Sequence, residues 1–362
     1  MFRLEDLGWG PFFQQQLNNG DAPELVPARV AEEAKGACRA VTEAGALLAT
    51  VSGRLRHEAL TREQLPATGD WVLLVRVDAS SAVIHRVLER RTKLSRKIAS
   101  GAERRSGGRT EEQILAANVD TVFVVAALNR DFNPRRLERY LAAVWESGAR
   151  PVVVLNKADL HDDLPQAVRE AKALSPGVEV IATSILTGEG IDVMRATLRS
   201  GETAVFVGSS GVGKSSLINR LLDNDTLTVR GIRDDGRGRH TTTSRQLLML
   251  PGGGVVIDTP GLRELTLWDA DAGLERAFAD VDSFVQQCAF RDCRHTGEPG
   301  CAVLEAIDEG KLPDERFANY RKLEREREFL ARRQDKALEI AERKRWKQIH
   351  KQNRERMRLR GR

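Results

Sequence analysis

The stretch Gly208-Ser209-Ser210-Gly211-Val212-Gly213-Lys214-Ser215 decides the fold predicted for this 362-residue chain. It follows the apolar run 204–207 and precedes an amphipathic segment that begins at Ser216. A strand, a glycine-rich loop and a helix in this order are typical of the phosphate-binding loop of nucleotide triphosphatases. The glycines allow a tight turn whose N–H groups converge on an anion, and the helix adds its positive dipole end. We expect residues 208–216 to bind nucleotide, with Lys214 on the β- and γ-phosphates and Ser215 on Mg²⁺.

A second motif, Asn156-Lys157-Ala158-Asp159, directly follows the apolar run 151–155. The Asp159 carboxylate can accept hydrogen bonds from N1–H and the 2-amino group of guanine together, whereas adenine has neither donor. A site built around such bonds rejects an analogue that lacks them. We therefore expect guanine as the base, with Asn156 bonding its edge and bracing the loop and the Lys157 stem lying on the ring. Thr183-Ser184, which ends another apolar run, is expected to support the base through backbone contacts.

A third motif, Asp258-Thr259-Pro260-Gly261, follows the apolar run 255–257. We expect Asp258 to hold Mg²⁺ through water and the Gly261 N–H to sense the γ-phosphate. Apolar runs alternate with helix patterns through this region, which predicts a doubly wound α/β domain with the motifs at the carboxyl ends of strands. The base-reading motif precedes the phosphate loop in the chain, so the motif order is a circular permutation of the usual GTPase order.

The composition is that of a globular protein, with 41% hydrophobic and 5% aromatic residues. No uncharged apolar run approaches the length of a membrane span, and residues 1–6 do not resemble a secretory signal. We therefore expect a cytoplasmic protein with no membrane partner. The net charge is +5, and residues 341–362 hold ten Lys or Arg against two Glu. Such a basic tail predicts an acidic partner, nucleic acid first, although a solvated tail would have the same composition.

Three of the four cysteines cluster with a histidine in the pattern Cys288-x₄-Cys293-x-His295-x₅-Cys301. In a reducing compartment such a cluster predicts metal binding before disulfide bonding. Three thiolates and one imidazole complete a tetrahedral zinc site with no open position, so its role would be structural. Unrelated free cysteines and a redox switch are the alternatives. Cys38 stands alone and is expected to be a small buried hydrophobe.

Short strand-like runs split by turn residues follow one another between residues 34 and 97, which favours a small closed barrel of the oligonucleotide-binding (OB) type. A basic RNA-binding face and an ordinary solvated surface are both compatible with its charges. The basic residues on the barrel or at its exit are Arg54, Arg56, His57, Arg86, Arg90, Arg91, Lys93, Arg96 and Lys97.

Changes in pattern divide the chain into six predicted parts. Residues 1–33 form an extension, 34–97 the all-β barrel, 98–112 a linker and 113–270 the permuted nucleotide-binding domain. Residues 271–345 form a helical zinc-binding domain, and 346–362 a basic tail.

The motif order, the zinc pattern and the segment Gly238-Arg239-His240-Thr241-Thr242-Thr243 together make the chain resemble the circularly permuted GTPase family that depends on the small ribosomal subunit (RsgA, also called YjeQ or YloQ). The resemblance covers nearly the whole chain. It implies an OB barrel, a permuted GTPase domain, a zinc domain and a monomer that binds the small (30S) ribosomal subunit and its rRNA during late maturation. It also implies that Thr242, or else Thr241, completes the Mg²⁺ shell when GTP is bound.

Hydrolysis poses a difficulty, because Leu262 stands where many GTPases place a glutamine that orients water. Intrinsic GTP hydrolysis should therefore be slow, with another group or a partner completing the site. His240 is the candidate catalytic residue beside Lys214 and Thr242, since its imidazole can orient or accept a proton from water near neutral pH. Two rival hypotheses are an RNA-binding assembly chaperone in which GTP is mainly a conformational ligand, and a GTP-regulated DNA-binding zinc protein.

Overall fold

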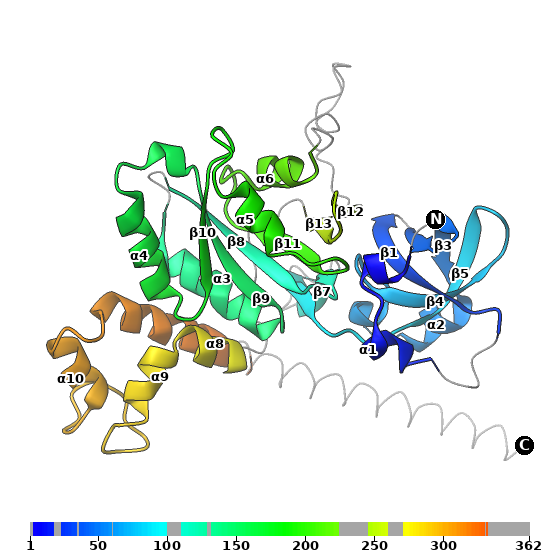
Figure 1. Ribbon diagram of the computed structural model, residues 1–362. Coiled ribbons are helices and arrows are strands. Elements are labelled where there is room, and N and C mark those ends of the chain that lie inside the picture. Colours follow the sequence, from blue (N-terminus) through cyan, green and yellow to red (C-terminus); the bar gives the residue numbers. More distant parts are fainter. Residues whose placement is uncertain are drawn as a thin grey trace, which may run out of the picture. The chain divides into compact units, whose positions relative to one another are not determined.

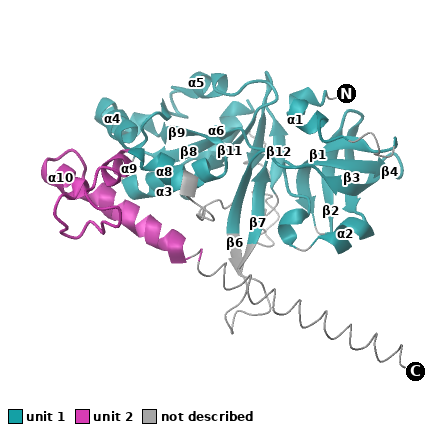
Figure 2. Ribbon diagram, turned by 90° about the horizontal axis from the view of Figure 1, so that it is seen from below, with its two compact units in different colours: residues 1–98, 111–267, 271–279 teal, residues 99–110, 268–270, 280–362 magenta. Residues whose placement is uncertain are grey.

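A computed structural model describes residues 3–17, 23–34, 36–59, 61–99, 110–128, 132–223, 245–259, 271–329 and 331. The chain divides into two compact units, the first formed by residues 1–98, 111–267 and 271–279, the second by residues 99–110, 268–270 and 280–362 (Figure 2). Across the described ranges, no helix combines the length and the apolar character needed to span a membrane.

The first unit is built on a continuous sheet of eleven strands in the order β10-β9-β8-β11-β13-β12-β1-β2-β3-β5-β4, beside a separate pair β6-β7 (Figure 1). The strands are β1 (Val26–Ala34), β2 (Ala37–Thr42), β3 (Gly45–Val51), β4 (Trp71–Arg76), β5 (Ser81–Val87), β6 (Lys93–Ala99), β7 (Thr110–Ala117), β8 (Thr121–Ala127), β9 (Arg150–Asn156), β10 (Glu179–Thr183), β11 (Thr203–Val207), β12 (Gln246–Met249) and β13 (Val255–Asp258).

Strands β1 to β5 close into the predicted five-stranded barrel, because β1 pairs with both β2 and β4. Successive side chains of β3 point to opposite faces of the barrel wall: Leu47 and Ala49 are buried in the barrel core, while Leu48 is exposed. A short helix, α2 (Gly53–Glu58), follows β3, and a 3-10 turn, η2 (Arg62–Gln64), precedes β4. β1 lies almost entirely within the range predicted as an extension, so the barrel begins before residue 34.

The chain before the barrel packs on it through η1 (Glu5–Leu7) and α1 (Pro11–Gln14). Leu7 and Phe13 are buried with Trp71 of β4 in one apolar cluster. The predicted linker 98–112 also differs from the structure, since β6 ends at Ala99 and β7 begins at Thr110, inside the predicted range.

The predicted doubly wound domain comprises the parallel strands β8, β9, β10, β11 and β13, with β12 antiparallel at its edge. α5 and α6 pack on the sheet face that carries Phe123 and Phe206, while the alternate residues of the same strands are buried on the opposite face. Asn133 caps the helix that Pro134 begins. The helices are α3 (Pro134–Glu146), α4 (Leu164–Leu174), α5 (Ile191–Ala196) and α6 (Lys214–Leu221), with the turn η3 (Ala158–Leu160).

The helix α8 (Asp271–Ala277) packs on α3 and belongs to the first unit, not to the zinc-binding part as predicted. Gly273 allows this packing, because a Cβ there would come within 2.3 Å of the Ala142 carbonyl oxygen. The second unit holds α9 (Ala279–Val285), α10 (Ala302–Asp308) and a helix over residues 314–329. Arg316 of that helix pairs with Asp280, at 2.6 and 2.7 Å.

One buried arginine joins three parts of the first unit. Arg29 is 1% exposed, and its burial lowers the pKa of the guanidinium to about 10. Its guanidinium donates hydrogen bonds to the Gly69 oxygen at 3.3 Å, the Asn118 oxygen at 3.2 Å, Thr203 Oγ1 at 2.8 Å and the Leu7 oxygen. The extension, the barrel and the α/β domain are thus bonded to a single side chain.

We expect Arg29→Ala to lower the free energy of unfolding of the full chain by about 3 kcal/mol or more, because several buried acceptors lose their donor. Urea unfolding followed by tryptophan fluorescence measures this loss. Arg39→Ala, which removes an exposed arginine from the next strand, is the control and should change stability by less than about 0.5 kcal/mol. Equal effects of the two variants would contradict the role given to Arg29.

Candidate functional site

The predicted phosphate loop connects β11 to α6. Gly208 and Gly213 have φ angles of 144° and 99°. A Cβ on Gly208 would lie 2.3 Å from the Val125 oxygen, and one on Gly213 would lie 2.4 Å from Asn156 Nδ2. Glycine is therefore required at both ends of the loop. The Lys214 ammonium lies over the loop and donates to the Gly208 and Ser209 oxygens, both at 2.7 Å.

The base-reading motif is hydrogen-bonded directly to this loop. Asn156, at the end of β9, is fully buried, and its Nδ2 donates to the Val212 oxygen at 2.7 Å. Thr183 Oγ1, at the end of β10, donates to Asn156 Oδ1 at 3.2 Å. The Lys157 ammonium donates to the Gly211 oxygen at 3.0 Å. Asn156 and Lys157 are therefore both hydrogen-bonded to the loop between β11 and α6.

Asp159 and Ser184 lie side by side beyond these contacts. The Ser184 hydroxyl donates to Asp159 Oδ1 at 2.5 Å, which orients the carboxylate and leaves its other oxygen for a ligand. Ser184 thus contacts Asp159 through its side chain. The backbone contacts of Thr183 and Ser184 with a base remain a prediction. Ala158 is buried between the two polar residues of its motif.

Asp258 ends β13, next to the strand that leads into the phosphate loop. Burial raises the pKa of its carboxyl group, and the positive charge of Lys214 opposes that shift. A partly desolvated carboxylate near an ammonium suits a group that meets a cation and phosphates. Ser215 and Ser216 lie in the first turn of α6. The carboxyl ends of β9, β10, β11 and β13 therefore bring the described motif residues to one edge of the sheet.

Arg136 is a residue of this site that the sequence analysis missed. It lies in the first turn of α3, and its Nη1 donates to Ser209 Oγ in the phosphate loop at 2.5 Å. The two residues are 73 positions apart, and no motif links them. The Arg136 guanidinium is thus a second cationic group at the loop, in addition to the Lys214 ammonium.

Several predicted residues lie outside the described part of the chain. They are His240, Thr241, Thr242 and Gly261, together with the tail 346–362.

The predicted metal ligands come together in the second unit. Cys288 lies just after α9, and Cys301 is the residue before α10, so the cluster joins the ends of two helices. The ligand atoms of Cys288, Cys293, His295 and Cys301 all lie within 4.8 Å of one another. His295 has a φ angle of 55°, which places its ring toward the thiols at the cost of a conformation that few residues other than glycine adopt.

The distances between these atoms fit a tetrahedral zinc ion. His295 Nδ1 is 3.6 Å from Cys288 Sγ and 3.4 Å from Cys301 Sγ. Zn–S bonds of about 2.3 Å and Zn–N bonds of about 2.0 Å at tetrahedral angles separate S and N by about 3.5 Å. The Glu298 carboxylate accepts the N–H groups of Arg294 and Thr296, and thereby holds the loop around His295. The donor set and its geometry therefore suggest a zinc site.

Most of the basic residues predicted for a barrel face are used inside the first unit. Arg90 forms two hydrogen bonds of 2.7 Å with the buried Asp70. Arg91 pairs with Asp120, and Lys93 with Glu63. Arg86 donates to the Gln16 oxygen, Arg96 to Gln113 and Arg54 to Glu58. These charges are structural contacts, which a sequence cannot distinguish from a binding surface.

Comparison with known proteins shows which family the chain resembles. The RsgA GTPase family model matches residues 87–268. A protein named small ribosomal subunit biogenesis GTPase RsgA, from Opitutus terrae, is 46% identical, with 99% of each chain covered. A relative named small ribosomal subunit biogenesis GTPase RsgA 2, from Lactiplantibacillus plantarum, is 48% identical, with 80% of each chain covered.

Solved structures give the same result. YjeQ from Thermotoga maritima is 29% identical with a TM-score of 0.61, covering 84% of this chain and 98% of its own. YloQ, described as a circularly permuted GTPase, is 22% identical with a TM-score of 0.58, covers 88% of this chain and 99% of its own, and shares the fold. The family model covers half of the chain and relatives above 40% identity span nearly all of it, so the chain belongs to the RsgA GTPase family.

Proposed function

We propose that this protein hydrolyses GTP and uses the cycle to assist late maturation of the small ribosomal subunit. What most supports the activity is the hydrogen bonding of Asn156 and Lys157 to Val212 and Gly211, since it fixes the base-reading motif to the phosphate loop. The names of the curated relatives support the subunit as partner. In this proposal the protein is a monomer of the cytoplasm that contacts rRNA and no membrane.

Each residue has a defined part in hydrolysis. The loop 208–216 cradles the phosphates, Lys214 neutralises the β- and γ-phosphates, and Asp159 selects guanine while Ser184 orients it. Ser215, Asp258 and Thr242 would hold Mg²⁺, which spreads the developing charge of phosphoryl transfer. The Gly261 N–H would meet the γ-phosphate. A single zinc ion would hold the ends of α9 and α10 together in a purely structural role.

Multiple-turnover phosphate release tests the function directly. Purified protein should hydrolyse GTP slowly alone, faster with small (30S) subunits, and not faster with large subunits. ATP should give no turnover above background. If small subunits leave turnover unchanged while GTP still alters subunit binding, GTP is mainly a conformational ligand and the RNA-binding chaperone alternative replaces this proposal.

His240 is proposed as the group that completes the catalytic site on the ribosome. We expect His240→Ala to reduce subunit-stimulated GTP hydrolysis by about a hundredfold, because general-base or water-orienting groups contribute at least this much. GTP affinity, measured by calorimetry, should stay within about twofold. His161→Ala, which removes an exposed histidine of the described part, is the control. Unchanged stimulated turnover in the His240 variant would exclude the role.

A further inference from the structure

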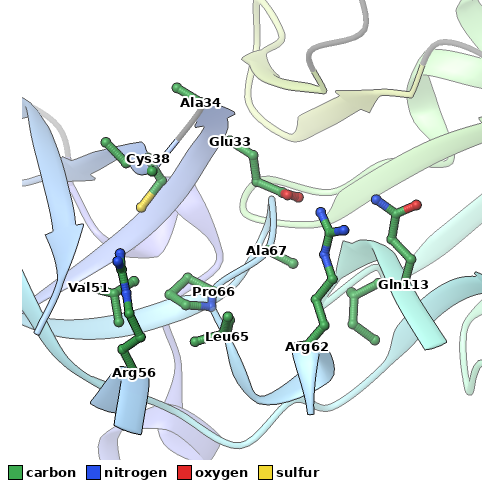
Figure 3. Close-up of a pocket in the computed structure, with 13 residues that line it drawn as sticks. Glu33, Ala34, Cys38, Val51, Arg56, Arg62, Leu65, Pro66, Ala67 and Gln113 are labelled. Atoms are coloured by element: carbon green, nitrogen blue, oxygen red, sulfur yellow. The ribbon is translucent and has the colours of Figure 1, made fainter. Parts of the chain in front are cut away.

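A cavity of about 270 Å³ lies in the first unit, apart from the nucleotide-binding motifs. Its walls come from β1, β2, β3, α2, η2 and β7 (Figure 3). Two of its lining residues are arginines, Arg56 of α2 and Arg62 of η2. None of the nucleotide-binding or zinc-binding residues described above lines it, so it belongs to neither site.

The two arginines lie on opposite sides of an apolar floor. In Figure 3 their side chains rise on either side of Leu65 and Pro66, with Glu33 and Cys38 across from them. Both arginines are exposed, and among the described residues neither guanidinium has a hydrogen bond or ion pair to protein. They differ in this from Arg86, Arg90, Arg91, Lys93 and Arg96, which are bonded to protein groups.

The charge of the cavity is positive. Glu33 is the acidic residue among those that line it, and its carboxylate pairs with Arg245 at 3.1 Å. This pair is close to neutral, so the charges of Arg56 and Arg62 remain. A positive cavity on the side of an OB-type barrel suits an anionic ligand, and nucleic acid is the ligand such barrels commonly take.

The volume of the cavity and its lining residues limit the kind of ligand that fits it. The volume equals that of about nine liquid waters, at about 30 Å³ each, which exceeds a bare phosphate and approaches the smallest ligand pockets. Val51, Leu65, Pro66 and Ile114 provide apolar surface for a flat ring. Gln113 supplies a polar group at the rim, where its Oε1 already accepts from Arg96 Nε at 2.9 Å. A base in the cavity with phosphates on either side matches all of these features.

We propose that this cavity binds one unpaired nucleotide of a single-stranded RNA, with its base against Leu65 and Pro66 and its flanking phosphates on Arg56 and Arg62. Binding of splayed-out bases of single-stranded segments is common in RNA recognition. The proposal deepens the rRNA contact of the proposed function by assigning it a position. It does not depend on GTP hydrolysis.

The test uses the full chain with saturating GDP and Mg²⁺, so that the guanine site is filled. Binding of a fluorescein-labelled penta-adenylate RNA is measured by anisotropy over a range of salt. We expect Arg56→Gln and Arg62→Gln each to weaken binding about tenfold and to lower the salt slope by about 0.7. Ala34→Leu, which fills the cavity from an exposed wall position, should weaken binding without changing net charge.

Arg54→Gln is the matched control, because it removes the same charge from the same helix outside the cavity. It should weaken binding less than twofold. An equal loss in the Arg54 variant, or no loss in the Ala34 variant, would reduce the interaction to diffuse electrostatics and overturn the proposal. Adenosine 3′,5′-bisphosphate distinguishes RNA from a free nucleotide as the ligand. If it binds as tightly as the RNA, the cavity is a site for a free nucleotide and the proposal is wrong. Intrinsic GTP turnover should be unchanged in all variants, so a failure here is distinct from a failure of the GTPase proposal.

Discussion

Asp159→Asn is expected to change the preferred nucleotide from GTP to XTP. In the proposed site the Asp159 carboxylate would accept from two donors of guanine, N1–H and the 2-amino group. Asparagine offers one acceptor and one donor. Xanthine keeps N1–H but has a carbonyl oxygen in place of the 2-amino group, so its edge matches the amide. Because mismatched hydrogen-bonding sites discriminate by factors of about 10⁴, we expect a change in relative affinity of at least a hundredfold.

The structure indicates that this variant keeps its architecture. The Ser184 hydroxyl donates to Asp159 Oδ1, and an asparagine Oδ1 can accept the same bond. The bonds of Asn156 and Lys157 to the phosphate loop do not involve residue 159.

Calorimetric titration with GTP, XTP and ATP measures the change. Asp162→Asn, three residues away and exposed, is the control and should leave the preference for GTP intact. If the Asp159 variant still binds GTP as tightly as the native protein and ignores XTP, Asp159 does not read the base.

The turns and strand ends that carry the proposed nucleotide-binding motifs could be predicted because each depends on neighbours in the sequence. The turn at Gly208 and Gly213 needs positive φ angles, which only glycine adopts freely, and Asn156 to Asp159 form one short segment after a buried strand. The strand pattern before each motif then places them at one sheet edge. Structural features that are set by residues close together in the sequence can be predicted in this way.

The parts that could not be predicted depend on residues far apart in the sequence. β1 was missed because Pro27, Glu32 and Glu33 are unusual in a strand. Its acidic residues are satisfied by the distant Gln246 and Arg245.

The contact between Arg136 and Ser209 could not be predicted for the same reason, because the two residues lie far apart in the sequence. The hydrogen bonds of Arg29 also join distant residues. The same holds for charge: a sequence shows that Arg90 is basic but not that Asp70 neutralises it.

The zinc site leads to the largest expected effect on stability. We expect Cys301→Ser to lose the metal and to unfold the part of the second unit that surrounds it. Cys301 precedes α10 and Cys288 follows α9, so without the metal these short helices lose the link between their ends. Structural zinc contributes about 10–16 kcal/mol in small zinc-binding peptides, far more than helices of this length supply by themselves.

Elemental analysis and amide hydrogen exchange on the full chain measure both effects. The native protein should contain one zinc per chain, and the variant much less. Amides of residues 302–308 should exchange in the variant at rates close to those of unfolded chain, while β11 and α6 stay protected. GTP affinity should change less than about threefold, since the described nucleotide-binding residues all belong to the first unit.

Cys38→Ala is the matched control. Cys38 lies buried in the barrel, 4% exposed, and burial raises the pKa of its thiol to about 12, so that it remains protonated and is unsuited to bind metal. This variant should keep one zinc per chain and the exchange pattern of the native protein. Were Cys301→Ser instead to retain zinc, or were residues 302–308 to remain protected without it, the cluster would not be what holds these helices together.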